Sequence, residues 1–513
     1  MKHTLCALLE HAATNAPNHI ALIDNDVQYT YSQLRDMSTR FAHYLLHAHS
    51  ISCYSRIGVY MGNSVEQIIS IFAIARIGAI FVPINANATV SQIEHIVDDC
   101  NIMKIILNES QQLNIPFSRC LSFWEGGWND LTESESDSFS TAPISSDLAA
   151  ILYTSGSTGK PKGIMVTHDN LVAGADSICE YLRITQNDRL LSILPFSFDY
   201  GLNQLLTCFR QHATLIIKNP YTMFEIPFLI EHYEITGLAG VPTIWVHLIQ
   251  QRNIAKYGYR KLRYITNSGG SLPAFCLDEL PVCFPHTDIY LMYGLTEAFR
   301  STYLEPKEYS RKKGSIGKSI PNAEVMVLNK EGAICKPFEV GELVTRGPMV
   351  TLGYWGNEDA TREVFRPNPQ MISQLKNKDI AVFSGDLGYM DEEGFLFFQG
   401  RNNNMIKHHG VRISPTEIEE ILYLARGIVE CAVVGVKDPV DDEQIVAYLC
   451  VKENEDKISL LNEIKELCQE KLPTYMYPSD FIFLKRLPKT TTGKVDTGKL
   501  KGAYYEYLQC GDQ

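Results

Sequence analysis

Hydrophobic and polar positions follow two periods along the N-terminal part of the chain. Amphipathic stretches at residues 32–47 and 65–75 predict helices, and short apolar runs at residues 56–60 and 79–83 predict strands. Strands that alternate with helices in this way are typical of a layered α/β fold with mostly parallel sheets. We therefore expect an α/β architecture built from layered sheets.

A polar loop separates two further apolar runs, Leu148–Tyr153 and Ile164–Val166. The segment Tyr153–Gly163 reads Y-T-S-G-S-T-G-K-P-K-G. The segment offers hydroxyls, cations and backbone amides with little side-chain bulk, and this combination predicts a phosphate-binding loop. We expect a helix to begin near Asp169. The segment lacks the glycine spacing of a P-loop, and Pro follows its first lysine. From these residues alone, a plain surface turn stays open.

The chain of 513 residues is too long for one hydrophobic core, so it predicts at least two domains. Three consecutive Asn residues after Gly400-Arg401 predict the boundary, which gives a large N-terminal domain of residues 1–400 and a small one of residues 401–513. Beyond it, Ser414 followed by Pro and acidic residues predicts a capped helix start, and Val429–Val436 predicts a strand. The C-terminal part is therefore expected to be a compact α/β domain.

Bulk composition narrows the functional class. A net charge of −13 opposes nucleic-acid binding, since phosphate backbones are held by basic surfaces. The 13 cysteines form no C-x-x-C pair and stand at no metal spacing with His, which predicts free thiols in a reducing compartment. Charged residues follow the short apolar run Leu5–Leu9, and Arg76, Gly78 and Pro83 interrupt the run at residues 68–84. We expect a cytoplasmic protein with no membrane span and no nucleic-acid partner.

Five further motifs follow the loop in a fixed order. They are S-G-G-S-L-P at residues 268–273, Y-G-L-T-E at 293–297, S-G-D at 384–386, G-R at 400–401 running to G-V-R-I at 410–413, and P-K-T-T-T-G-K at 488–494. With the loop, they resemble the signature motifs of the adenylate-forming superfamily, which includes acyl-CoA synthetases, amino-acid adenylation domains and firefly luciferases. An ordered set is far more specific than any single motif. The resemblance covers roughly residues 10–500 and implies a large N-terminal domain and a small mobile C-terminal one.

The resemblance implies a nucleotide-binding role for each matching residue. The loop residues that would fold over the β- and γ-phosphates are Thr154, Ser155, Ser157, Thr158 and Lys160. Glu297 matches the acid that helps to hold Mg²⁺, Thr296 would contact the α-phosphate, and Tyr293 would flank the adenine. Asp386 matches the carboxylate that accepts both ribose hydroxyls, and Arg401 would lie near the same ribose or phosphate. Taken alone, these short motifs would read as turns or packed aromatic residues.

Lys494 matches the catalytic lysine of the family, which bridges the substrate carboxylate and the phosphate. One ammonium group can neutralise both approaching anions in a partly desolvated site. The resemblance implies that the small domain rotates and that its hinge falls on Asn403, where relatives commonly carry Asp or Lys. Gly410 would give clearance to a pantetheine arm. His408 and its neighbour at 409 are expected at the surface rather than in catalysis.

Residues 198–202, where the acid pocket of the family begins, can be aligned with the family in two ways. If F-D matches amino-acid adenylation domains, Asp199 would pair with a substrate ammonium. If the segment matches acyl-CoA synthetases, Phe198 replaces their common aromatic-site His, and Leu295 favours this branch because amino-acid domains usually carry Pro there. Asp199 could also be an ordinary helix-capping acid. Further candidate pocket residues are Trp245, Asn267, Gly269 and Gly270.

These residues together predict an AMP-forming carboxylic acid–thiol ligase. The cofactors would be ATP and Mg²⁺, and the acceptor would be CoA or a phosphopantetheine thiol. The leading hypothesis is an acyl-CoA synthetase that acts on a small carboxylic acid. The alternative is a free-standing amino-acid ligase that loads a separate carrier protein, and an adenylate-binding pseudoenzyme is a third.

Overall fold

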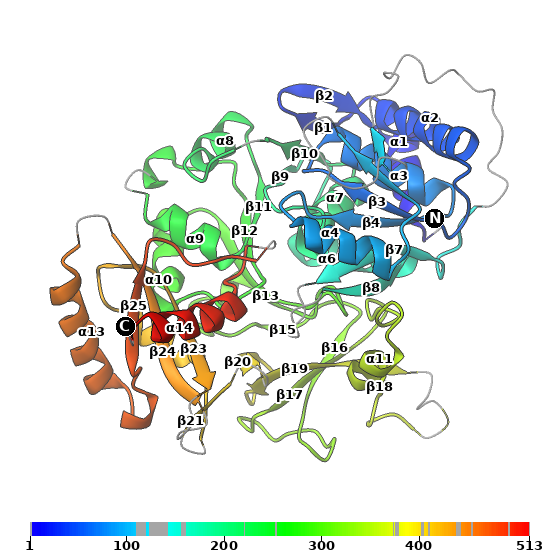
Figure 1. Cartoon of the computed structure of the whole chain (residues 1–513). Coiled ribbons are helices and arrows are strands. Elements are labelled where there is room, and N and C mark those ends of the chain that lie inside the picture. The colour runs from blue at the N-terminus through cyan, green and yellow to red at the C-terminus, as the bar shows by residue number, and fades with distance from the viewer. Residues whose placement is uncertain are drawn as a thin grey trace.

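A computed structural model describes residues 3–108, 120–122, 142–154, 161–219, 221–251, 254–372, 374, 379–401, 405–408, 411–437, 443–452, 455–490 and 493–511. The described residues up to Ser319 form two large sheets with helices between and around them (Figure 1). A five-stranded sheet lies below them in this view, and the C-terminal elements lie at its left. The predicted fold class, a large α/β domain followed by a smaller one, is confirmed.

The first large sheet has six strands in the order β6-β5-β3-β4-β7-β8. Its strands are β3 (Arg56–Tyr60), β4 (Ile80–Ile84), β5 (Lys104–Leu107), β6 (Cys120–Ser122), β7 (Leu148–Thr154) and β8 (Lys162–Thr167), and its helices are α3 (Val65–Arg76), α4 (Val90–Asp99) and α6 (His168–Leu182). All neighbours pair in parallel except β7 and β8. The predicted strands, the predicted helix 65–75 and the helix start near Asp169 agree with these bounds to within two residues.

The second large sheet has nine strands in the order β15-β14-β13-β12-β11-β9-β10-β1-β2. Its strands are β1 (Ile20–Asp24), β2 (Val27–Thr30), β9 (Arg189–Leu191), β10 (Thr214–Ile217), β11 (Gly237–Gly240), β12 (Tyr264–Asn267), β13 (Asp288–Tyr293), β14 (Thr302–Leu304) and β15 (Lys318–Ser319). The helices of this part are α1 (Leu5–Asn15), α2 (Tyr31–His49), α7 (Asp199–Arg210), α8 (Ile226–His232), α9 (Pro242–Ile249), α10 (Ala274–Cys283), η2 (Ile254–Tyr257) and η3 (Pro306–Glu308). The central strands are parallel, as expected, and the pairs at both edges are antiparallel.

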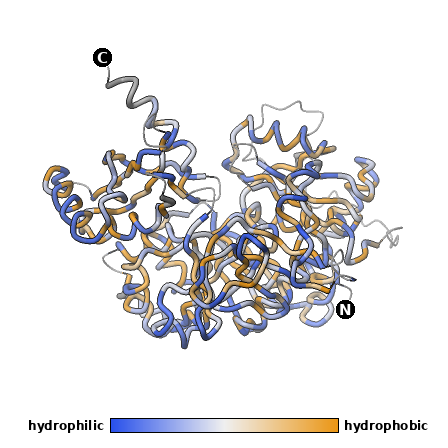
Figure 2. The backbone as a smooth tube through the Cα atoms, turned by 90° about the horizontal axis from the view of Figure 1, so that it is seen from below, coloured by the Kyte–Doolittle hydropathy of each residue, from blue (hydrophilic) through white to orange (hydrophobic). Residues whose placement is uncertain are grey.

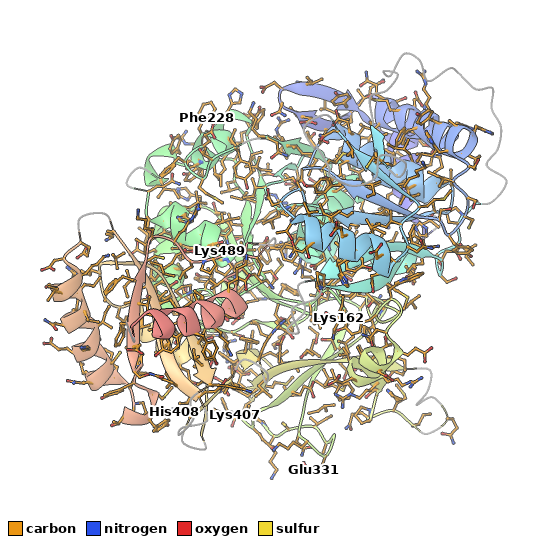
Figure 3. All side chains as sticks on the ribbon, viewed as in Figure 1. Lys162, Phe228, Glu331, Lys407, His408 and Lys489 are labelled. Atoms are coloured by element: carbon orange, nitrogen blue, oxygen red, sulfur yellow. The ribbon has the colours of Figure 1, made fainter. Side chains whose placement is uncertain are left out.

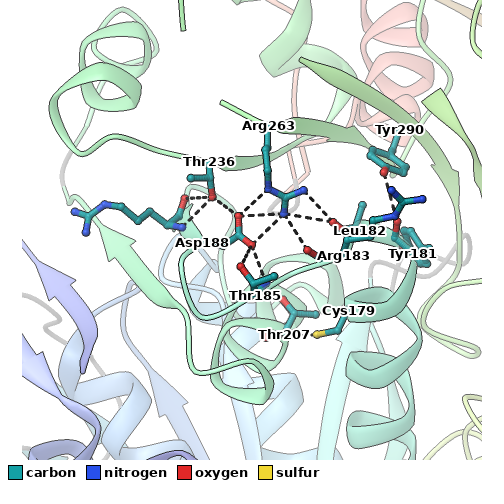
Figure 4. Close-up of polar contacts among 11 residues, drawn as sticks. Cys179, Tyr181, Leu182, Arg183, Thr185, Asp188, Thr207, Thr236, Arg263 and Tyr290 are labelled. Carbon is teal, nitrogen blue, oxygen red and sulfur yellow. Dashed lines mark hydrogen bonds and ion pairs between the residues drawn. The ribbon is translucent and has the colours of Figure 1, made fainter. Parts of the chain in front are cut away.

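A buried carboxylate joins three strands of the nine-stranded sheet. Asp188, 2% exposed, accepts a hydrogen bond from Thr236 Oγ1 at 2.6 Å and a bidentate contact from Arg263 Nη2 at 3.0 Å (Figure 4). Its second oxygen accepts the backbone N–H of Thr185 at 2.7 Å. Because every oxygen is paired, the buried charge costs little and fixes the starts of β9, β11 and β12 relative to one another.

The core between the two large sheets is a layer of helices. Helix α7 contacts β10 of one sheet and α6, which in turn contacts β7 and β8 of the other. Helix α1 contacts both α3 and α7, and the rings of Phe72 on α3 and Phe209 on α7 stack at 5.3 Å. Apolar stretches gather in the interior, and hydrophilic ones lie mainly along the outside (Figure 2). This packing carries the residues between β9 and α7 to the middle of the molecule.

The third sheet departs from the expected parallel arrangement, because all its pairs are antiparallel. It contains β16 (Glu324–Leu328), β17 (Gly341–Arg346), β18 (Phe365–Pro367), β19 (Ile380–Met390) and β20 (Leu396–Arg401), with α11 (Glu358–Val364) beside β18. The expected domain boundary after residue 400 falls near the end of β20 and stays a prediction.

The C-terminal elements have a hydrophobic core of their own, built around Ile418, Val433 and Leu449. They are β21 (Ile406–His408), β22 (Val411–Ile413), β23 (Ile428–Lys437), β24 (Glu443–Val451), β25 (Asp480–Leu484), α12 (Pro415–Leu422), α13 (Lys457–Lys471), η4 (Thr474–Met476) and α14 (Thr497–Gly511). The predicted helix after Ser414 and the predicted strand 429–436 are both present. The Ser414 hydroxyl does not cap that helix; it donates to the Gln399 carbonyl of β20 at 2.9 Å. Within the described residues, no helix is long and apolar enough to cross a membrane.

Candidate active site

Three residues from separate motifs meet at the end of β13. Asp386 and Arg401 are register partners on β19 and β20, and they form an ion pair in which Arg401 Nε lies 2.9 Å from Asp386 Oδ1. The Tyr293 hydroxyl donates to the other carboxylate oxygen at 2.7 Å. Burial raises the pKa of Tyr293 well above its ordinary value, so its hydroxyl remains a donor. Asp386 is 2% exposed, and a carboxylate of this kind can accept a hydrogen bond on each of its two oxygens.

The residues after Tyr293 leave β13 in a loop and bring an acid beside cationic groups. Glu297 Oε1 accepts a hydrogen bond from the Tyr354 hydroxyl at 2.6 Å, and the Glu297 carbonyl accepts the Thr351 N–H at 2.9 Å. The ammonium of Lys162 lies 5.2 Å from the centre of the Tyr354 ring. Tyr354 therefore positions Glu297, and Lys162, the first residue of β8, lies over the ring of the same tyrosine. Sequence reasoning did not single out Tyr354, which is 57 residues from Glu297 and belongs to no motif.

Asp199 begins α7 and is 5% exposed. Its Oδ1 accepts a hydrogen bond from Thr296 Oγ1 at 3.1 Å, which connects the F-D segment to the Y-G-L-T-E loop. Burial raises the pKa of Asp199 above its usual range, and the positive charges of Arg300 and Lys494 offset part of that rise. Gly201 lets this helix start lie against the preceding backbone, because a Cβ there would stand 2.2 Å from the Pro195 carbonyl oxygen.

Lys494 reaches this site from the C-terminal elements. Its carbonyl accepts the Thr490 N–H at 2.7 Å in a tight turn with Gly493 at φ +81°, and residues 489 and 495 form an antiparallel bridge. The ammonium lies 5.9 Å from the centre of the Phe198 ring, and Cε lies 3.5 Å from where a Cβ on Gly269 would be. Figure 3 shows Lys489, from the same segment, near the middle of the molecule.

The charge state of Lys494 is set by groups from both domains. Protein surrounds the side chain on several sides and lowers its pKa below the usual lysine value, and the charge of Arg401 adds to that effect. Asp199, Asp386 and Glu297 act in the opposite direction. The side chain still keeps contact with solvent. Lys494 is therefore a solvent-exposed cation that is influenced by the charges of three carboxylates and can still meet an anion.

Arg300 is a buried residue near the acid pocket that sequence reasoning missed. It is 2% exposed, its Nη1 donates to Ser268 Oγ at 2.9 Å, and its guanidinium carbon lies 4.3 Å from the centre of the Tyr200 ring. The available signal was a basic residue inside the otherwise uncharged segment 298–304, shortly after Y-G-L-T-E. Such a signal is weak, because an arginine in a strand region is usually at the surface.

The other candidate pocket residues lie at different depths. Trp245 is fully buried, with its indole against Gly240 and edge-to-face with Phe284 at 6.3 Å. Asn267 ends β12, and its Nδ2 donates to the Gly270 carbonyl at 3.1 Å. Gly269, at φ +84°, faces Phe198 and Lys494. Of this set, Gly269 directly borders the lysine.

Several expected site residues lie outside the described part of the chain. They are Ser155, Ser157, Thr158, Lys160, Asn403 and Gly410. Thr154 is the last residue of β7 and pairs with Lys162 on β8, so it stands where the phosphate loop begins. His408 lies at the lower edge of the molecule in Figure 3, and its Nδ1 is 2.7 Å from the Glu443 carbonyl.

Comparison with known proteins agrees with this arrangement. The sequence profile of the AMP-binding enzyme family matches residues 9–355, and that of the AMP-binding enzyme C-terminal domain matches residues 417–494. The chain belongs to the AMP-binding enzyme family. Both matched segments are therefore domains of adenylate-forming enzymes, and the predicted resemblance to that superfamily is confirmed.

Its relatives include both CoA ligases and peptide synthetases. The chain is 28% identical to 2-succinylbenzoate--CoA ligase of Bacillus subtilis over 96% of this chain and 97% of that one. It is 28% identical to bacitracin synthase 2 of Bacillus licheniformis over 96% of this chain, but it spans only 18% of the length of that protein. A solved o-succinylbenzoate CoA synthetase from Bacillus subtilis, in complex with its acyl-adenylate intermediate, superposes with a TM-score of 0.84 at 26% identity, covering 96% and 97% of the two chains.

Proposed function

We propose that this protein is an AMP-forming carboxylic acid–thiol ligase. The observation that carries the proposal is that Lys494, from the C-terminal elements, lies beside Phe198 and Gly269, where the charges of Asp386, Arg401 and Glu297 act on it. This supports a role for one cation where an acid and a nucleotide phosphate would approach each other. The family match and the CoA ligases that resemble the whole chain support the same reaction.

The reaction has two steps. In the first, a carboxylate oxygen of the acid attacks the α-phosphorus of ATP, the bond to the bridging oxygen of the β-phosphate breaks, and pyrophosphate leaves. In the second, a thiol sulfur attacks the acyl carbon, the bond to AMP breaks, and the thiol proton passes to solvent. Lys494 would screen the two anions that meet in the first step, and Thr296 would contact the α-phosphate.

The nucleotide roles follow from the donors and acceptors at each position. Asp386 would accept the ribose hydroxyls, Tyr293 would lie beside the adenine, and Arg401 would stay near the ribose or phosphate. The loop residues Thr154, Ser155, Ser157, Thr158 and Lys160 would contact the outer phosphates. Asn403 as hinge and Gly410 beside the thiol arm stay predictions.

Glu297 fits a Mg²⁺ ion that also binds phosphate. Mg²⁺ usually takes one or two carboxylates together with substrate phosphates and water. In the described part of the chain, no three His, Cys, Asp or Glu side chains cluster as a cage for a metal, so a site of the shared kind is expected. Bound there, Mg²⁺ would neutralise phosphate charge. Tyr354 would fix the carboxylate that holds it.

A simple carboxylic acid is favoured over an amino acid. An amino-acid ammonium would need the charge of Asp199, but Arg300 and Lys494 already lie close enough to shift the pKa of that group. A third cation beside these two gains less than one facing an isolated carboxylate. CoA is therefore the favoured acceptor. Amino-acid loading of a separate carrier protein remains the second candidate, since relatives such as bacitracin synthase 2 contain a matching segment.

Hydroxylamine-trapped adenylation with ATP and Mg²⁺ tests the proposal across fatty, aromatic and amino acids. A hit among simple acids, followed by thioester formation with CoA, supports the acyl-CoA synthetase. A hit among amino acids that Asp199→Asn selectively removes supports the carrier-loading alternative. Absence of adenylation by the wild-type protein across the panel overturns the ligase proposal in favour of an adenylate-binding pseudoenzyme.

A further inference from the structure

Arg300 is a buried cation that the proposed chemistry does not use. A guanidinium carries five N–H donors, and at Arg300 only the bond from Nη1 to Ser268 Oγ, at 2.9 Å, is made within the described residues. Nε and Nη2 are buried and have no hydrogen-bond partner there. Buried donors without acceptors lose their bonds to water and gain nothing in exchange. This placement destabilises the protein on its own.

A second arginine of the same domain shows how a structural guanidinium is paired in this fold. Arg263 makes a bidentate contact with Asp188 and also donates to the carbonyls of Leu182 and Arg183 (Figure 4). Its donors are distributed over four acceptors. Both arginines stand just before a strand of the nine-stranded sheet, yet Arg300 has a hydroxyl, an aromatic face and the nearby charge of Asp199, without a hydrogen bond to that carboxylate among the described residues. The difference indicates that Arg300 is not placed to hold the fold together.

Arg300 lies between the Y-G-L-T-E segment, where its Nη1 is 3.3 Å from the position of a Cβ on Gly294, and the aromatic residues of the F-D segment. Its guanidinium stacks over Tyr200 at 4.3 Å, the Tyr200 ring meets Phe198 edge-to-face at 6.1 Å, and Lys494 lies 5.9 Å from the Phe198 ring. These contacts form a series with a cation at each end. Lys494 is at one end, and Arg300 is at the other, beyond the two rings.

A second incompletely paired polar group lies on the same helix face. Asn203 is 1% exposed, and neither atom of its side-chain amide has a hydrogen-bond partner within the described residues. It follows Asp199 by four residues and Tyr200 by three on α7, and residues at these spacings share one face of a helix. Two independent observations therefore point to a polar ligand group in this region.

We propose that Arg300, together with Asn203, recognises an oxygen acceptor on the acid at a distance from its reacting carboxylate. The inference rests on the proposed ligase function and deepens it. The substrate is then a carboxylic acid with a second oxygen function, either a neutral carbonyl or hydroxyl or a second carboxylate. Lys494 meets the reacting end, and Arg300 and Asn203 supply donors to the distal end.

The burial of Arg300 determines which side chain has to move before an acid can bind. Because Arg300 is closed off from solvent, the Phe198 ring, which separates it from Lys494, has to turn aside as the acid enters. Rotamer changes of this kind are common at binding sites. An unsubstituted alkyl chain would reach Arg300 without offering it an acceptor, and an ammonium would meet a like charge. Both are disfavoured at this position.

ATP–pyrophosphate exchange with matched acids tests the proposal. The acids are unsubstituted, oxo, hydroxy and dicarboxylic members of each chain length from four to eight carbons. We expect the wild-type protein to prefer one oxygen-bearing acid over its unsubstituted partner by about 100-fold or more in kcat/KM, since buried donors reject analogues that lack the acceptor. Arg300→Met should remove most of that preference, chiefly through KM. The preference is the ratio of kcat/KM for the two acids in the same protein, so a general loss of activity in the variant cancels.

Two further variants separate recognition from folding and from charge. Arg263→Met is the matched control: it should lower the melting temperature and leave the acid preference unchanged. Arg300→Gln keeps donors without charge, so it should retain part of the preference for a neutral acceptor and lose that for a dicarboxylate. An unchanged preference in Arg300→Met, or a wild-type preference for unsubstituted acids, overturns the proposal.

Calorimetric measurement of the binding of the same acids, in the presence of AMP, distinguishes failure of the ligase function from failure of the recognition by Arg300. If the wild-type protein exchanges no pyrophosphate with any acid, the ligase function fails. Binding of an oxygen-bearing acid that Arg300→Met weakens by about 100-fold would then still support recognition by Arg300. Exchange activity without any effect of Arg300→Met on binding leaves the ligase function standing and refutes the recognition.

Discussion

Removing the Lys494 ammonium should slow adenylation far more than any other single change in the C-terminal domain. Two anions, the acid carboxylate and the α-phosphate, would approach it. A unit charge about 4 Å from another, at an effective dielectric constant of about 20, is worth about 4 kcal/mol. The side chain keeps solvent contact, and Arg401 remains as a second cation, so we expect about 3 to 4 kcal/mol to be lost. Lys494→Ala should therefore lower kcat/KM for adenylation about 100- to 1,000-fold.

The assay separates the two half-reactions. Pyrophosphate exchange reports the first, and thioester formation from a synthetic acyl-adenylate reports the second, which should stay within about tenfold of wild type because the lysine has no anions to bring together there. Lys499→Ala is the matched control, since Lys499 lies in α14 with its side chain 68% exposed and pairs loosely with Asp496. It should change neither rate. Wild-type exchange by a folded Lys494→Ala protein would refute the reasoning.

The pH profile gives an independent check on the same residue. Protein around Lys494 and the charge of Arg401 lower its pKa, so the ammonium loses its proton at a lower pH than an ordinary lysine does. The adenylation rate should fall as pH rises through that lowered pKa. In Lys494→Arg the guanidinium stays charged, so the remaining activity should lose this alkaline limb. An alkaline limb that is the same in both proteins would mean that another group titrates.

Three further predictions concern the metal, the helix start and a buried histidine. Glu297→Gln should raise the Mg²⁺ concentration for half-maximal exchange at least tenfold, measured by Mg²⁺ titration, because a carboxylate ligand is lost. Gly201→Ala should destabilise the fold by about 3 kcal/mol in urea unfolding, since its Cβ would stand 2.2 Å from the Pro195 carbonyl, whereas Gly502→Ala, with open space around it, should not. Burial lowers the pKa of His168 from 6.5 to about 4. Between these two pH values the unfolded chain therefore binds a proton at this residue and the folded chain does not. Stability should therefore fall by up to about 3 kcal/mol as pH drops from 6.5 to 4, and urea midpoints should fall less in His168→Gln.

Much of the fold is encoded in local pattern. Two short apolar runs of five residues form β3 and β4, with bounds within one residue of the prediction. Strands that are buried on both faces are easily recognised, because they appear in the sequence as continuous apolar runs. The antiparallel third sheet was not anticipated, since its strands do not alternate with helices and carry no comparable signal. Ser414 was correctly placed before a helix, but its hydroxyl bonds to Gln399 because that carbonyl lies within reach in three dimensions.

The candidate site, like the fold, was predicted from the sequence only in part. Tyr293, Asp386 and Arg401 were assigned through motifs, and the structure joins them by a hydrogen bond and an ion pair. Tyr354 and Arg300 belong to no motif, and their importance depends on which partners the fold brings to them. A periodic pattern carries no information about a hydroxyl that meets a carboxylate 57 residues away. Such contacts come from the way the strands are ordered within the sheets.

The contacts of the C-terminal domain bear on the prediction that this domain rotates between the two half-reactions. In the arrangement seen here, Lys494 lies beside Phe198, and the domains also touch through the rings of Phe275 and Tyr423 at 5.6 Å and through Gln250 Nε2 and the Val429 carbonyl at 3.4 Å. These contacts come from α9 and α10 of the large domain, and neither is a buried ion pair. Aromatic and peripheral polar contacts of this kind can be exchanged at little cost in free energy. We therefore predict that these contacts hold during adenylation, with the lysine in place, and separate when the domain rotates and a thiol reaches the acyl carbon.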